Sequence, residues 1–318
     1  MNHIKNFLMR FRYGRDLQLY HNPERKNQDL FAFEVLTNGL ITNVTGFTIL
    51  TAMLISLGAS DGMIAQAGML PRYISVLSIF TGFLLVRVRD VKRFVVAGMA
   101  LFRLCALLPV LFLPAPPRLA VWGVVAAFAL SYVVYLPVNP IKSMWFLSKV
   151  PLSIRGEYLS IHSNFNILLG LVVTPLVGLL LDMMKADLHT AFALLFALGL
   201  AFSAADILLF SRVEQSRVHL ERPAGMGEML KAPLRNRKFI KLIVLVLTVD
   251  LALSIASVYG GVFALKYLQV PYTFYMLQSA LGSLVSLWMT RAAGRLADRC
   301  GYLPVILGML FFNLPVML

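Results

Sequence analysis

Charged residues are scarce in this sequence, and acidic residues are the scarcest of them. Asp, Glu, Lys and Arg together make up 14% of the 318 residues, whereas soluble domains carry about 25%. Apolar residues make up 59%, and the mean hydropathy is +0.77. Because such a chain cannot bury its apolar surface in one water-soluble core, its composition indicates a polytopic membrane protein.

The sequence also lacks clustered catalytic and metal-binding residues. Neither of its two cysteines, Cys105 and Cys300, has a neighbour at the spacing of a metal or redox pair. The five histidines are scattered, and there is no phosphate-binding loop, G-x-S-x-G turn or H-E-x-x-H motif. We therefore expect no cofactor, no bound metal and no enzymatic activity.

Long apolar stretches recur at roughly even spacing along the chain. A helix needs about 20 residues to cross the hydrocarbon core of a bilayer. The stretches that reach or approach this length lie near 32–58, 62–86, 94–113, 119–147, 157–183, 189–211, 239–267 and 271–291, and from 302 to 318. Each of them is predicted to be a transmembrane helix, and the Pro-rich segment 113–118 is predicted to be a turn.

One long polar connection, 212–238, divides this pattern after the sixth span. The predicted fold is therefore an all-α membrane protein with a six-helix bundle and the start of a second bundle. Its expected parts are a basic N-terminal segment (1–31), the six-span bundle (32–211), a linker (212–238) and an incomplete C-terminal bundle (239–318).

Basic residues gather on one side of this layout. Most of the 29 Lys and Arg residues lie in the N-terminal segment, in the linker and in the links that the span order places on the same side. Cytoplasmic loops of membrane proteins carry such an excess, so we expect a cytoplasmic N-terminus and a cytoplasmic linker. The net charge of +14 then reflects membrane topology, and no nucleic-acid partner is expected.

A short charged stretch, GRLADRCG, follows the eighth predicted span on the cytoplasmic side. Together with the six spans, the long linker and the second bundle, it resembles the major facilitator superfamily of secondary transporters. The signature of that family is G-x-x-x-D-R-x-G. Gly294, Asp298, Arg299 and Gly301 match it, and Tyr302 stands where a basic residue often follows. The resemblance implies that these four residues form a conformational latch.

The resemblance also implies a second copy of the latch after the second span, because the two halves of the family are repeats. Aligning Gly82 with Gly294 places Val86 at the position of the acid. The first-half counterpart is therefore degenerate, and its candidate residues are Gly82, Arg87 and Asp90. Family members usually have twelve spans, so the resemblance further implies that the chain is a fragment or a truncated relative.

Polar residues inside the predicted spans are the candidates for a substrate or proton site, because a charge there costs about 2.5–3.5 kcal/mol to insert. In the family the first, fourth and seventh spans line the central cavity. That implies a cation- or proton-binding role for Asp250, with a structural acid as the alternative. The candidate residues are Asp250, Asn43, Asn139, Arg72 and Arg103.

The other candidates also have a structural alternative. Arg72 and Arg103 are suited to attract an anionic substrate or to form ion pairs within the bundle. Asn43 and Asn139 are suited to hydrogen-bond a substrate or to join helices. Three more charged residues, Glu34, Lys142 and Asp206, lie near the cytoplasmic ends of their spans, where we expect them to snorkel or to pair.

The expected function is secondary active transport of a small solute or ion across the cytoplasmic membrane by alternating access. An ion gradient, most simply of protons, would supply the energy, because no nucleotide-binding motif is present. The lipid bilayer is the other expected partner, and no obligate protein partner is inferred. Two alternatives remain: a transport-inactive relative acting as a sensor or assembly factor, and a membrane-embedded enzyme acting on lipid-linked substrates.

Overall fold

A computed structural model describes residues 24–75, 90–150, 155–215 and 260–285 of the chain. It also describes single positions or short pieces elsewhere, at 77, 78, 81, 88, 235–237, 240, 241, 244, 247, 248 and 308. All regular secondary structure in these residues is helical. The elements are α2 (Arg25–Thr45), α3 (Phe47–Ser56), α4 (Asp61–Ser75), α6 (Val91–Leu107), η3 (Leu108–Phe112), α7 (Pro117–Ser148), α8 (Arg155–Met183), α9 (Leu188–Arg212) and η5 (Phe263–Tyr267). Residues 272–285 form a further helical segment.

Five of the predicted spans are confirmed as helices long and apolar enough to cross a membrane. They are Lys26–Ser56, Val91–Phe112, Pro117–Ser148, His162–Met183 and Leu188–Arg212. The predicted spans near 62–86 and 271–291 are described only in part. Those near 239–267 and 302–318 lie largely outside the described residues.

The helix ends follow from local sequence signals. The carboxylate of Asp90 accepts the backbone N–H of Arg93 at 3.0 Å and begins α6, and Asp187 begins α9 in the same way through Thr190. Such caps satisfy donors that the first turn of a helix leaves without partners. Pro117 begins α7, where its missing N–H costs nothing. These signals fix the short links between consecutive spans.

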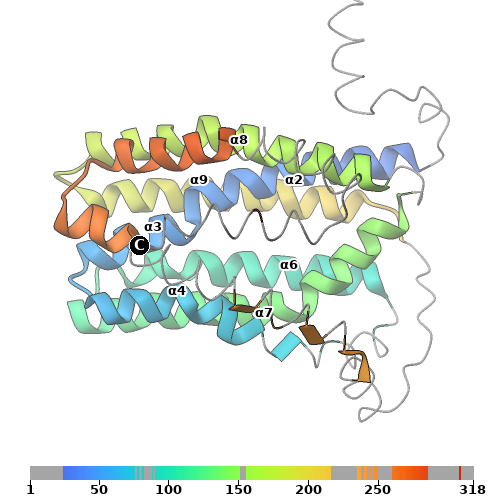
Figure 1. Ribbon diagram of the computed structural model, residues 1–318, viewed down its shortest axis with the longest axis horizontal. Coiled ribbons are helices and arrows are strands. Elements are labelled where there is room, and N and C mark those ends of the chain that lie inside the picture. The colour runs from blue at the N-terminus through green and yellow to red at the C-terminus, as the bar shows by residue number, and fades with distance from the viewer. Residues whose placement is uncertain are drawn as a thin grey trace, which may run out of the picture.

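The helices form one elongated bundle in which chain segments far apart in sequence lie side by side (Figure 1). Helix α2 packs along α9 and α8, α6 packs along α7, and α6 also contacts α9. Large apolar side chains remain exposed on the outside, among them Leu101, Trp122, Val172 and Leu208. Apolar side chains outside and packed helices inside fit a lipid environment.

The first span is broken at Gly46, between α2 and α3. The backbone there is extended, with φ −72° and ψ 180°. A Cβ at this position would collide with the carbonyl oxygen of Thr42, so this geometry requires glycine. The sequence predicted a single continuous span over 32–58. The break is a difference that hydropathy does not register, because an average over about 20 residues does not mark a single glycine.

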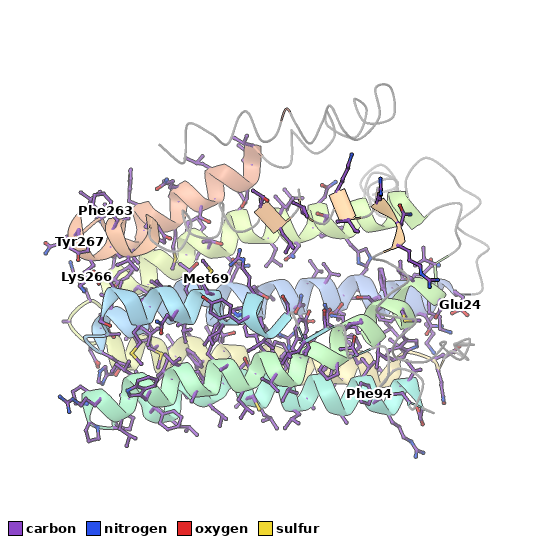
Figure 2. The ribbon with its side chains drawn as sticks, turned by 60° about the horizontal axis from the view of Figure 1, so that its bottom comes forward. Glu24, Met69, Phe94, Phe263, Lys266 and Tyr267 are labelled. Carbon is purple, nitrogen blue, oxygen red and sulfur yellow. The ribbon has the colours of Figure 1, made fainter. Side chains whose placement is uncertain are left out.

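The links between helices lie at two opposite ends of the bundle. Glu24 and Phe94 lie at one end, which we name the linker end, and Lys266 and Tyr267 lie at the other, the outer end (Figure 2). At the linker end, Lys149 pairs with Glu24 at 3.2 Å. The two ends are thus distinct in sequence and in contacts.

Candidate functional site

Two buried ion pairs cross the interior of the bundle, and the first joins α6 to α9. Arg103 donates from Nε and Nη2 to Asp206 Oδ2 at 3.2 and 3.0 Å, and the two side chains are 4% and 0% exposed. Thr37 donates to the other oxygen of Asp206 at 2.8 Å. Arg103 Nη2 also donates to Asn38 Oδ1 at 2.6 Å. This pair therefore has the extra hydrogen bonds that a desolvated ion pair needs.

The second pair joins α2 to α7. Lys142 Nζ donates to Glu34 Oε1 at 2.7 Å, and both side chains are largely buried. The ammonium also lies 5.2 Å from the centroid of the Phe210 ring, within the range of a cation–π contact. The sequence left open whether Glu34 and Lys142 snorkel or pair. In the structure they pair with each other inside the bundle.

Together the two pairs form a layer, named here the neutral layer: Glu34, Arg103, Lys142 and Asp206. Each member comes from a different helix, namely α2, α6, α7 and α9. Two positive and two negative charges leave the layer without net charge. It holds four helices in register through contacts that each require a specific partner.

A cavity of about 80 Å³ lies beside the neutral layer. Its walls come from α2, α3, α6, η3 and α7, and the break at Gly46 forms part of them. Arg103 lines it, with hydroxyl groups from Thr42, Thr45 and Ser131. The described structure thus brings one of the predicted candidates, Arg103, to a cavity between helices whose wall is partly polar.

The other described candidates lie elsewhere. Asn43 accepts a hydrogen bond from Thr174 at 2.6 Å and donates to Gly39 O at 2.7 Å, so it joins α2 to α8. Asn139 accepts from Tyr135 within α7 at 2.8 Å. Arg72 lies near the end of α4 and is partly exposed. None of the three lines the cavity.

Most of the predicted latch residues lie outside the residues that the structure describes. Asp90 is described, and it caps α6 and pairs with Arg93 at 3.1 Å. The remaining candidates lie outside the described residues: Gly82, Arg87, Asp250, Gly294, Asp298, Arg299 and Gly301. Their roles stay predictions. Within the ranges that are described, no three His, Cys, Asp or Glu side chains gather as metal ligands would.

Polar contacts at the outer end connect the first six spans to the segment beyond the linker. Asp182 at the end of α8 accepts the backbone N–H groups of Tyr272 and Thr273 at 2.9 and 2.7 Å. It therefore caps helix 272–285 from a different helix, where a negative charge is favourable. Close by, α8 carries Gly178. A Cβ there would lie 2.8 Å from Thr273 Cα, so only glycine lets the two backbones approach this closely.

A second outer contact involves Asp61, at the start of α4. Its carboxylate accepts hydrogen bonds from Lys266 and from the hydroxyl of Tyr267. Asp61 lies just before the span predicted near 62–86. The two hydrogen bonds, of which that from Lys266 has the larger effect, hold the pKa of Asp61 below its usual range. Both outer contacts depend on a carboxylate, so each can be removed by a single Asp→Asn substitution.

No model of a known protein family matches the chain, and no curated protein matches it. The resemblance to the major facilitator superfamily therefore depends on the motif, the charge pattern and the span layout. What the structure establishes is an all-helical fold in the described residues, with five helices suited to cross a membrane.

Sequence reasoning missed two of the hydroxyl residues of the cavity, Thr42 and Ser131, and the acids of the outer end. Ser131 and Tyr132 form a polar pair within the apolar stretch AAFALSYVV, and Asp182 ends an apolar run. Each of these polar residues visibly interrupts an apolar stretch of the sequence. Only the packing of the helices shows which of them lie together. Asp206 and Arg103 are more than one hundred residues apart, so their pairing had no local signal.

Proposed function

We propose that the protein is a secondary transporter of the major facilitator type. Its first bundle and the segment beyond the linker would move relative to each other and expose an interior site to each side of the membrane in turn. In this proposal the N-terminus is cytoplasmic and the outer end faces away from the cytoplasm. The latch at Gly294–Gly301 regulates the opposite, cytoplasmic end.

The observation that carries the proposal is the nature of the outer contacts. Asp182 and Asp61 hold segment 260–285 against the first bundle through hydrogen bonds to backbone N–H groups, an ammonium and a hydroxyl. The segment also buries Val262 and Met276 in the apolar core that contains Val177 and Leu181 of α8, so it is held by polar and apolar contacts together. The neutral layer ties α2, α6, α7 and α9 into a single unit. The polar contacts at one end and the separate neutral layer support a first bundle that moves as a unit relative to the segment beyond the linker.

Proton coupling is the simplest energy source for this transporter. Asp250, in the middle of the seventh predicted span, is the proposed proton carrier. Transport by an Asp250→Asn variant should no longer respond to a proton gradient, and an unchanged response would remove Asp250 from this role.

Alternating access predicts two distances between the first bundle and the segment beyond the linker at the outer end. These distances can be measured without knowing the substrate. Spin labels at Ser60→Cys and Leu268→Cys, both exposed, would report that separation in a chain with Cys105→Ala and Cys300→Ser. Pulsed dipolar spectroscopy in lipid nanodiscs is expected to give two distance populations whose ratio changes with conditions. A single narrow distance under every condition would instead favour a static role, such as a sensor or an assembly factor.

Acid is expected to release the Asp61 contact. Because the pKa of Asp61 is lowered in the folded protein, its contribution is present above the ordinary Asp pKa of about 3.9 and is lost as the pH falls through the lower, folded value. The outer distance should therefore be insensitive to this group between about pH 5 and 8 and should lengthen only below about pH 4.

The matched variant for this pH prediction is Asp61→Asn, measured with the same labels. It should show the lengthened population already at neutral pH, and its acid response should shrink. Any response that remains comes from groups other than Asp61. If the acid response is identical in both proteins, Asp61 does not hold the outer end.

A further inference from the structure

We propose that the cavity beside the neutral layer binds a small, uncharged molecule that carries hydroxyl groups, with a small polyol as the simplest member of this class. The identification of polyols as the transported substrate rests on the proposed transport function. Binding of a polyol to the cavity can be measured without transport. The cavity, of about 80 Å³, has room for more than one ordered water, which needs about 10–15 Å³.

The charge of the cavity wall argues for an uncharged ligand. Arg103 is the charged residue that lines the cavity, and Asp206 already neutralises it at 3.0 Å. Lys142 and Glu34 neutralise each other in the same layer. A charged ligand would lose its hydration without meeting an uncompensated counter-charge, which is costly in a low-dielectric interior.

The wall nevertheless offers hydrogen-bond donors. A guanidinium has five N–H groups, and Arg103 uses its Nε and Nη2 groups toward Asp206 and Asn38. Within the described part of the chain, no acceptor bonds to its Nη1 group. Two N–H donors on a side chain that is 4% exposed are therefore available to an oxygen atom in the cavity.

The wall also offers acceptors. Thr42, Thr45 and Ser131 line the cavity, and their hydroxyl groups donate hydrogens to carbonyl groups of their own helices, at 2.8, 2.8 and 2.7 Å. Because each hydrogen is directed to the backbone, the oxygen lone pairs are left to accept. Donors on one side and acceptors on the other match a hydroxyl group, which both donates and accepts.

Aromatic side chains complete the cavity. Phe47, Phe128 and Tyr132 lie in contact, with ring centroids 6.1 Å apart for the first two and 5.0 Å apart for the last two. Phe102 adds a further ring to the wall. These apolar faces suit the carbon skeleton of a polyol, while Arg103 and the hydroxyl groups suit its oxygens. Recognition by a few polar groups among apolar walls is usual for small-molecule sites.

The test compares glycerol with two molecules of the same carbon skeleton, glycerate and 3-amino-1,2-propanediol, which are an anion and a cation at neutral pH. The full chain is purified in detergent without polyols, and its thermal unfolding is followed at millimolar ligand. Glycerol and the longer polyol erythritol are expected to raise the midpoint in a saturable manner. The charged analogues are expected to have no such effect.

A Ser131→Ala variant decides whether the effect comes from this cavity. Loss of one acceptor is expected to weaken polyol binding about five-fold. Ser148→Ala is the matched control, because Ser148 lies on the same helix and makes the same kind of bond, to Trp145 O at 2.6 Å, but does not line the cavity. General stabilisation by polyols rises without saturation and is the same in both variants.

Three outcomes would overturn the proposal: no saturable effect of either polyol, tighter binding of a charged analogue, or equal affinity in Ser131→Ala and Ser148→Ala. Uptake of radiolabelled glycerol and erythritol into proteoliposomes then separates the two proposals. Saturable, Ser131-dependent binding without uptake would leave the binding site standing and contradict transport. Movement of the outer end without polyol binding would support transport and contradict the binding site.

Discussion

An Asp206→Leu variant is expected to lose about 3–5 kcal/mol of stability, because it leaves Arg103 charged and unpaired inside the bundle. Asp206 is fully buried, and its two oxygens accept from Arg103 and Thr37. The Arg103 side chain is 4% exposed, so little water can take the place of the lost carboxylate. The measurement is unfolding of the purified protein in mixed micelles at increasing denaturing detergent, followed by far-ultraviolet circular dichroism.

The double variant Arg103→Met, Asp206→Leu tests the reason for this loss. Removing both charges removes the unpaired ion, so most of the lost stability should return. Asp90→Asn is the surface control. It breaks a pair whose Arg93 side chain is 89% exposed while keeping a capping oxygen, and pairs of this kind contribute at most about 1 kcal/mol. Equal losses in the single and double variants would show that the pair itself is not what stabilises the bundle.

Gly178→Ala is expected to shift the outer end toward its open arrangement by about 5- to 150-fold, the equivalent of about 1–3 kcal/mol for overpacking. The added methyl group would lie 2.8 Å from Thr273 Cα and 2.9 Å from Tyr272 O. These are backbone atoms, so they cannot turn aside as the end of a side chain can. The spin labels at positions 60 and 268 measure the change as a larger fraction of the long distance.

Gly170→Ala is the matched control for this prediction. Gly170 lies on the same helix, α8, two turns away, and the nearest atoms to an added Cβ are Asn43 Oδ1 and Thr174 Oγ1, both at 3.9 Å. That is ordinary contact, so the outer distance should stay as in the unmodified chain. An equal shift in both variants would mean that helix propensity, and not the contact with residues 272 and 273, is responsible.

Hydropathy predicted the five confirmed spans well, because the need to bury about 20 apolar residues in lipid is a property of each segment alone. Their ends were close to the structure: 119–147 was predicted where α7 runs from Pro117 to Ser148. The helix break was missed, since hydropathy averages over about 20 residues and does not mark a single glycine within a span. What the structure adds is the extended backbone of Gly46, where a Cβ would collide with Thr42 O.

The candidate site was less accessible to sequence reasoning. Arg103 was identified because a charge within a span is rarely accidental. Its partner Asp206 was assigned to the membrane interface, because only the packing of α6 against α9 places the two together. Asn43 and Asn139 were chosen for the spans they occupy. Span identity says which helices meet, but side-chain direction decides which residues share a cavity.

The neutral layer has a consequence for the order in which the protein is made. Lys142 follows Glu34 by 108 residues, and Asp206 follows Arg103 by 103. At about 5–20 residues per second, the first member of each pair waits about 5–20 s for its partner. Until α9 emerges from the ribosome, Arg103 has no counter-charge, so the early helices cannot settle into their final arrangement. Completion of the layer therefore marks the moment at which the first bundle becomes a finished unit, before the spans predicted beyond the linker reach the membrane.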